Sequence, residues 1–425
     1  MLTSDENDLL TRTDPGTRMG ELMRRYWIPA LLADELAAPD AAPKRLTLLG
    51  EKLVAFRDST GRVGLFDERC PHRNASLFFG RNEEEGLRCV YHGWKFDVTG
   101  QCVDMPSEPA ESNYKNKVQI TAYPCLERGG VVWTYLGPPE LKPDFPDLEW
   151  TQVPSSHRYT TRRLQQCNWL QGYEGGWDTA HLPILHLGDT QNSNFFSGKG
   201  KEALRGIPAH YEFIPTDYGF VYGRGRQNPN GGLNWECALM FMPSWKMFQP
   251  FAGADNRITL LAWVPVDDEN CMLWGVEYHP RRALSDEEMA WSKSHHYIHV
   301  ELEPGTVRPS RNKDNDYLVD HKRQASGQSF TGVLGLGLQD SAIQESMGPI
   351  CDRTREHLGP ADVVLVKLRR HLLRLLDDMD GGAKLPANDA ASYRLRPGII
   401  ALADGEPLED KLDEHLRIEA PVMAK

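Results

Sequence analysis

Two cysteines and two histidines form the most informative chemical pattern in this chain of 425 residues. Only Pro71 separates Cys70 from His72, sixteen residues follow, and then two residues separate Cys89 from His92. Two thiolates and two imidazoles suit a Rieske [2Fe–2S] centre, in which histidines replace cysteines on one of the irons. They also suit a zinc site. Zinc fingers usually group cysteine with cysteine and histidine with histidine, whereas each loop here carries one cysteine and one histidine. We therefore predict the iron–sulfur centre.

A second group of metal-ligand residues follows further along the chain. Asp178 and His181 are three residues apart and share one face if the segment is helical. Pro183 would break or kink that helix, so that His186 turns back towards the same point. Two converging imidazoles are part of a two-histidine-one-carboxylate site, which leaves positions on Fe(II) open for oxygen and substrate. We therefore predict an electron-storing centre and an oxygen-activating centre in one chain.

The missing carboxylate ligand has to come from elsewhere in the fold. Asp340 stands in a segment with a helical pattern, residues 338–348. Glu345 is a rival on the same element and Asp352 a weaker one, and the chemistry of Fe(II) accepts any of the three. An aspartate at this position is also a common helix N-cap. The residues alone leave this choice open.

The sequence around these residues resembles one family. Residues 70–73 and 89–97 are similar to the Rieske domain of ring-hydroxylating oxygenases, and the resemblance extends from residues 20–29 to residues 353–359. The chain resembles the α subunit of Rieske non-haem iron oxygenases, in the phthalate dioxygenase-like group. Respiratory Rieske proteins carry an additional cysteine in each loop, and this chain does not. The cluster is therefore expected to have a lower potential, as suits an electron donor to oxygen chemistry.

The resemblance implies a fold and a role for each candidate residue. The fold is α+β: a Rieske [2Fe–2S] β domain and a catalytic domain with a helix-grip-like antiparallel sheet covered by helices. Asp178 is the catalytic carboxylate, which bridges His92 of one subunit to His181 of the next. The metal ligands are Cys70, His72, Cys89 and His92 for the [2Fe–2S] Rieske cluster, and His181, His186 and Asp340 for a mononuclear Fe(II).

The resemblance also implies the reaction and the partners. The chain would be the oxygenase component that activates O2 to hydroxylate a small aromatic substrate, expected to be an aromatic carboxylate. Electrons would come from a separate flavin and ferredoxin-type reductase, and the assembly would be a homotrimer or homohexamer. Five cations are candidates for holding the substrate carboxylate: Arg205, Arg224, Arg226, Lys246 and Arg257. Residues 188–200, with Phe195 and Phe196, are a candidate lid.

Two alternatives remain open. A monooxygenase or O-demethylase on the same scaffold would use the same iron, so the motifs do not separate it from a dioxygenase. A zinc-stabilised binding protein without enzymatic activity would use the same residue types as structural ligands. It would be colourless and would consume no oxygen.

Composition excludes other classes of function. The net charge is −12, from 48 Lys and Arg against 60 Asp and Glu, without a basic block, so we expect neither nucleic acid nor a membrane as partner. No apolar run reaches the roughly eighteen residues that span a bilayer. The acidic N-terminus does not resemble a signal peptide, and the eight scattered cysteines are typical of a reduced, cytoplasmic protein.

Length and pattern predict more than one domain, because a Rieske domain needs little more than a hundred residues. We expect a helical lead-in over residues 1–36, because its apolar residues recur at helical intervals. A Rieske domain follows over 37–150, where short alternating runs predict strands. A proline-rich connector precedes the catalytic domain, residues 151–385, and residues 386–425 form a polar tail, in which residues 395–402 are a candidate short strand.

Overall fold

The computed structural model describes residues 2–109, 111–189, 210–249 and 257–419. The chain forms two compact units, Thr13–Pro143 and the larger Met1–Arg12 with Asp144–Lys425. This division differs from the expected domains at the N-terminus. Helix α1 (Ser4–Thr11) belongs to the larger unit, whereas α2 (Arg18–Met23) and strand β1 (Ile28–Leu32) belong to the smaller one. The expected helical lead-in therefore ends in a strand, formed by an apolar run.

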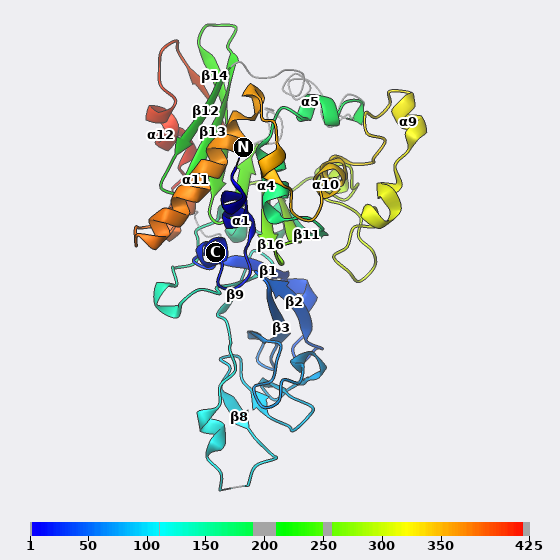
Figure 1. Cartoon of the computed structure of the whole chain (residues 1–425), viewed down its shortest axis with the longest axis vertical. Coiled ribbons are helices and arrows are strands. Elements are labelled where there is room, and N and C mark those ends of the chain that lie inside the picture. Colours follow the sequence, from blue (N-terminus) through cyan, green and yellow to red (C-terminus); the bar gives the residue numbers. More distant parts are fainter. Residues whose placement is uncertain (1, 110, 190–209, 250–256, 420–425) are drawn as a thin grey trace. The chain divides into compact units, whose positions relative to one another are not determined.

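The smaller unit consists of three antiparallel sheets (Figure 1). The first has the order β1-β10-β9, with β10 (Val131–Thr134) and β9 (Cys125–Arg128). The second has the order β2-β3-β4, with bounds Lys44–Leu48, Glu51–Arg57 and Val63–Asp67. The third has the order β5-β6-β7-β8, with bounds Arg81–Glu83, Gly86–Arg88, Lys95–Phe96 and Cys102–Asp104. This is the β domain that the sequence predicts for the cluster.

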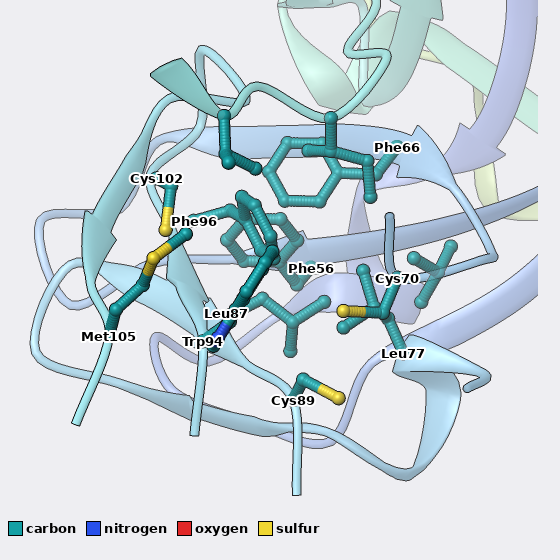
Figure 2. Close-up of a cluster of buried hydrophobic side chains, with 13 residues drawn as sticks. Phe56, Phe66, Cys70, Leu77, Leu87, Cys89, Trp94, Phe96, Cys102 and Met105 are labelled. Carbon is teal, nitrogen blue, oxygen red and sulfur yellow. The ribbon is translucent and has the colours of Figure 1, made fainter. Parts of the chain in front are cut away.

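A buried apolar cluster holds the second and third sheets of this unit together. Phe56 and Phe66 pack edge to face at 4.9 Å between ring centroids, and Leu87, Trp94 and Phe96 extend the cluster (Figure 2). Edge-to-face aromatic pairs place the positive ring edge against the negative ring face, which adds to the gain from burial. The cluster supports the chain on both sides of the two cysteine loops.

The larger unit is built on one antiparallel sheet of eight strands. Seven strands follow the order β11-β17-β16-β15-β14-β13-β12, and β18 (Gly398–Leu402) pairs with β14. Their bounds are β11 Arg158–Gln165, β12 His210–Pro215, β13 Gly219–Gln227, β14 Leu233–Phe241, β15 Trp245–Phe248, β16 Ile258–Pro265 and β17 Cys271–Tyr278. β18 is the short strand that the sequence offered within residues 395–402 of the tail, and it pairs with the sheet of this unit.

Helices cover this sheet, as the sequence predicts. The main helices of this unit are α4 Trp169–Trp177, α8 Asp286–Ser292, α10 Leu336–Ser346 and α11 Val363–Asp380, and shorter ones are α3 Glu149–Gln152, α5 Leu182–Leu185, α9 His321–Ala325 and α12 Leu412–Leu416. In Figure 1, α11 crosses β12 and β13, and the ring of His371 packs against Phe213 and Phe220 there. None of the helices in the described ranges is long and apolar enough to span a bilayer.

Helix α4 lies unusually close to the sheet because it carries glycines. A Cβ at Gly172 or Gly176 would meet the ring of Trp263 on β16 at 2.3 or 2.4 Å, and one at Gly175 would meet Gln344 of α10 at 2.1 Å. Side chains at these positions would therefore push the helix outwards. The glycines bring the C-terminal end of α4, which precedes Asp178, directly onto β16 and α10.

A buried ionic network fixes the same helix from its other side. Glu174 of α4 accepts hydrogen bonds from Arg353 at 2.9 Å and from Arg369 of α11 at 2.5 Å. Arg353 is fully buried and also donates to Asn7 of α1. Arg369 also pairs with Glu356 at 2.6 Å. Helix α4 is thus tied to both α1 and α11 through charges that are buried but paired.

Candidate metal centres

The first candidate centre is a pair of loops in the smaller unit. The N–H of Asn74 donates to the carbonyl of Cys70, and that of Gly93 to the carbonyl of Cys89, both at 2.9 Å. Asn74 and Gly93 have φ values of +59° and +76°, a region that asparagine and glycine tolerate best. The two loops therefore share one backbone form although their sequences differ.

The four predicted ligands of this centre lie close together. The rings of His72 and His92 are 4.3 Å apart between centroids, and Trp94 stacks on His72 at the same distance. Cys70 and Cys89 are buried at the edge of the apolar cluster (Figure 2). A hydrogen bond from the Cys70 thiol lowers the pKa of Cys89 to about 6, and the same contact raises the pKa of Cys70. Backbone N–H groups of its own loop lower the pKa of Cys89 further, and such groups stabilise a thiolate, the form that binds metal.

The grouping of these side chains suits a centre with two metal ions. The thiols of Cys70 and Cys89 contact each other, and so do the rings of His72 and His92. A Rieske [2Fe–2S] cluster holds two cysteines on one iron and two histidines on the other, so a pair of each matches its division of ligands. Nδ1 of His72 is buried without a hydrogen-bond partner among the described residues, as expected of a ligand atom. The loops therefore fit the cluster better than zinc.

The second candidate centre lies in the larger unit. His181, His186 and Asp340 each offer one ligand atom, and these atoms lie within 4.8 Å of one another. Oδ1 of Asp340 is 3.4 Å from Nε2 of His181 and 3.3 Å from Nε2 of His186. Two nitrogens and one carboxylate oxygen that converge in this way are the donor set of non-haem Fe(II) sites with open positions.

Asp178 and His181 come together at a break between two helices. The sequence suggested instead that they share one face of a single helix, and this was wrong. Helix α4 ends at Trp177, Asp178 is its C-cap with extended backbone, and His181 is the N-cap of α5. Oδ1 of Asp178 accepts the N–H of Ala180 at 2.8 Å, and Oδ2 lies 3.1 Å from Nδ1 of His181. The contact therefore runs through a turn in which the aspartate binds its own backbone.

Charges attract one another across this second centre. Burial lowers the pKa of His181, but Asp178 and Asp340 raise it more, to about 9. Burial raises the pKa of Asp340, and His186 and His181 outweigh that effect, so it lies well below the usual range. A divalent cation that displaces the protons of the histidines would preserve this attraction.

The two rival carboxylates, Glu345 and Asp352, have structural partners instead of a place in the second centre. Glu345 accepts hydrogen bonds from a tyrosine hydroxyl and a backbone N–H at 2.5 and 3.0 Å. Asp352 caps the short helix η7 (Arg353–Arg355). Neither rival carboxylate therefore joins the histidines, whereas Asp340 does.

A cavity opens beside the second centre, and all three of its residues line it. Among the predicted cations, Arg224 and Lys246 also line the cavity. Arg224 pairs with Glu236 at 2.8 Å, so its charge is compensated. Arg226 and Arg257 are not lining residues, and Arg205 lies outside the described residues. The structure thus reduces five candidate cations to two.

Lys246 is the cation of this cavity that lacks a carboxylate partner within the described ranges. Its Nζ donates to the carbonyl of Gly176 and lies 5.2 and 4.7 Å from the ring centroids of Trp177 and Phe248. Burial, followed by the charge of Arg224, lowers its pKa to about 7, against the opposing effect of the Asp340 and Asp178 carboxylates. The ammonium is therefore held against aromatic rings in a place where an additional anion would stabilise it.

Sequence reasoning missed one contact of the second centre. Oε1 of Gln339 lies 2.7 Å from Nδ1 of His186. In the sequence, its position next to Asp340 was the one indication that Gln339 could lie at this centre. The candidate lid continues beyond Asp189 into residues 190–200, which lie outside the described residues.

Comparison with known proteins finds a family match for each of the two units. The Rieske [2Fe-2S] domain family matches residues 26–124, and the family described as LigXa C-terminal domain like matches residues 134–392. The oxygenase subunit of 3-chlorobenzoate-3,4-dioxygenase from Comamonas testosteroni is 38% identical over 91% of each chain. The oxygenase subunit of phthalate 4,5-dioxygenase from Pseudomonas putida is 37% identical over 90% of this chain and 88% of its own. The oxygenase subunit of 5,5'-dehydrodivanillate O-demethylase from Sphingobium sp. SYK-6 is 33% identical over 90% of this chain and 82% of its own.

Solved structures have the same fold. A mutant of NdmA from Pseudomonas putida CBB5 with caffeine aligns with a TM-score of 0.60 at 18% identity, over 92% of this chain and 99% of its own. The α+β fold class is confirmed, and family membership excludes the zinc-stabilised binding protein. The chain belongs to the Rieske non-haem iron oxygenase α subunits, in the group of the phthalate and 3-chlorobenzoate dioxygenases, enzymes that use a Rieske [2Fe–2S] cluster and a mononuclear iron on aromatic compounds.

Proposed function

We propose that this chain is the oxygenase component that oxygenates an aromatic carboxylate with electrons from a separate flavin and ferredoxin-type reductase. Lys246 carries this proposal, because it lines the cavity together with His181, His186 and Asp340 and its ammonium makes no ion pair with a carboxylate of the described residues. The names of two relatives, a 3-chlorobenzoate and a phthalate dioxygenase, describe substrates of this class.

Each residue has a separate task in this proposal. Cys70, His72, Cys89 and His92 would hold the cluster, and His181, His186 and Asp340 would hold Fe(II). The iron supplies the activation of O2 at its open positions. Lys246 binds the substrate carboxylate and thereby orients the ring, while Trp177 and Phe248 keep water from the ammonium. Asp178 orients His181 by accepting the hydrogen of Nδ1.

Lys246→Met is expected to lower kcat/KM for an aromatic acid about 10- to 100-fold, because a charge-assisted hydrogen bond contributes about 1.5–3 kcal/mol. The ammonium is the form that binds a carboxylate, and its pKa is about 7. The wild-type kcat/KM should therefore fall as the pH rises above about 7. The measurement is oxygen consumption with the acid and with its methyl ester, at several pH values.

The ester and one variant are the controls. The ester has no carboxylate, so its kcat/KM should not depend on Lys246. Arg226→Met removes a cation of the same sheet that does not line the cavity, and it should leave the acid kinetics unchanged. An equal loss for acid and ester would contradict the assignment.

A homotrimer or homohexamer is proposed on the basis of exposed apolar residues. In the smaller unit Phe79, Val90 and Tyr91 near the cysteine loops are 63%, 56% and 55% exposed. In the larger unit Ile184 and Met347, on the helices that carry the second centre, are 55% and 50% exposed. Exposed apolar patches of this kind are typical of interaction surfaces, and a second copy would cover them if His92 approached Asp178 of its neighbour.

Ile184→Glu is expected to shift the assembly towards monomer, because it would bury a charge in that interface. Light scattering after gel filtration measures the molar mass. Val363→Glu, on the exposed start of α11, is the matched control and should leave the mass unchanged. A trimer that survives Ile184→Glu would contradict this placement of the interface.

Dioxygenation and monooxygenation or O-demethylation remain two outcomes of the same site. The relatives include dioxygenases and an O-demethylase. Product analysis after turnover with 18O2 distinguishes them, because a dioxygenase transfers both labelled atoms to the product and a monooxygenase transfers one.

A further inference from the structure

His186 is held by an amide, whereas His181 is held by a carboxylate. Nδ1 of His186 lies 2.7 Å from Oε1 of Gln339, and both side chains are buried, at 2% and 0% exposure. Nδ1 of His181 lies 3.1 Å from Oδ2 of Asp178. The two histidines that face Asp340 therefore have supports of different charge.

The neighbours of Gln339 determine which way its amide points. Its Nε2 donates to Oδ2 of Asp189 at 2.8 Å and to the carbonyl of Val333 at 2.9 Å. A carbonyl, and a carboxylate at neutral pH, only accept hydrogen bonds, so the NH2 group has to face them and Oε1 has to face His186. His186 must then carry its hydrogen on Nδ1, which leaves the lone pair of Nε2 directed towards Asp340.

Asp189 is itself held in place. The hydroxyl of Ser329, a fully buried residue, donates to Oδ2 of Asp189 at 2.5 Å. Arg323 of α9 donates to Oδ1 at 3.2 Å. The carboxylate thus binds the amide of Gln339 while α9 and the segment that follows it hold the carboxylate in place.

We propose that Gln339 and Asp189 are positioning residues that fix His186 in the Nδ1–H form required of an iron ligand. This inference rests on the proposed ligand set of His181, His186 and Asp340. The Gln339 amide fixes the orientation of the His186 ring but carries no net charge, whereas Asp178 places a negative charge beside His181. Supports of metal-bound histidines typically change metal affinity by about 10- to 100-fold when removed.

Equilibrium dialysis of the full-length protein against buffered Fe(II) under anaerobic conditions tests the proposal without reference to turnover. Iron bound beyond the cluster gives the affinity of the second centre. Gln339→Leu is expected to weaken it about 10- to 100-fold. Asn312→Leu removes another buried amide of the larger unit, which donates to the carbonyl of Pro309 and does not line the cavity, and it should leave the affinity unchanged.

A pair of substitutions provides a rescue that a merely structural role would not give. Gln339→Glu keeps the acceptor for His186 but sets a carboxylate against Asp189, so it should also weaken Fe(II) binding. Adding Asp189→Asn restores a donor opposite Glu and should recover most of the affinity. Wild-type affinity in Gln339→Leu, or the absence of any rescue in the double variant, would overturn the proposal.

His186→Ala separates this proposal from the one on which it rests. It should abolish Fe(II) binding at the second centre. If it does so while the Gln339 variants bind normally, the ligand set stands and the positioning role falls. If His186→Ala binds Fe(II) as the wild type does, the ligand set itself is wrong, and the positioning role falls with it.

Discussion

Asp178→Asn is expected to retain both metal centres and to slow electron transfer from the cluster about 100-fold. Asparagine has nearly the same shape, so one of the contacts with Ala180 and His181 survives. It loses the charge, and it loses one of the two acceptor oxygens that a bridge between His181 and His92 of the neighbouring subunit needs. Losing the support of a metal-bound histidine typically costs up to about 100-fold in activity.

Single-turnover kinetics measure this effect directly. Reduced protein with substrate is mixed with O2, and the visible absorption of the cluster reports its oxidation. Metal counting establishes that both centres are occupied. Asp352→Asn changes an aspartate that caps η7, and it should react at the wild-type rate. A wild-type rate in Asp178→Asn would exclude the carboxylate bridge.

Glu174→Gln is expected to lower the free energy of unfolding by about 3–5 kcal/mol, the usual cost of breaking a buried ion pair. The carboxylate compensates both Arg353 and Arg369, and these guanidinium groups are 0% and 3% exposed. Without it, Glu356 is left as a carboxylate partner of Arg369, and Arg353 keeps neutral acceptors on Asn7 and Cys351. Chemical unfolding followed by circular dichroism measures the loss.

The same network predicts the acid limit of stability. Burial raises the pKa of Glu174, but Arg353 and Arg369 lower it more, so it lies below the ordinary value. Its contribution is therefore complete at neutral pH and is lost as the pH falls below about 4.3 towards the lowered pKa. Glu356→Gln is the control, because Glu356 is 22% exposed and contacts Arg369 alone of the two arginines. An equal loss in both variants would contradict the central role of Glu174.

The features that the sequence predicted are those formed by residues close together along the chain. The four candidate cluster ligands come in two short motifs, and the structure brings the side chains of these motifs together. The contact between Asp178 and His181 was predicted as well, but for the wrong local reason, because the helix ends at Trp177. Strand β1 was missed since the apolar residues before it recur at helical intervals. Local patterns therefore identified the residues better than their backbone.

Contacts between distant segments were beyond local reasoning. Asp340 approaches His181 across more than 150 residues of chain, so its choice over Glu345 needed the family resemblance. Lys246 could not be distinguished from four other cations until the sheet showed which of them line the cavity. Gln339 drew no attention, because a glutamine has no metal chemistry of its own and matters only through His186.

The glycines of α4 have a consequence for engineering the substrate range. Gly175 and Gly176 form one wall of the cavity, and the same helix already lies against Trp263 and Gln344 without spare room. That wall can neither recede to admit a larger ring nor accept a side chain without moving Asp178. Libraries that aim at new substrates should therefore leave α4 unchanged and vary lining residues outside this helix, with Leu261, Tyr297 and Ile298 as first positions.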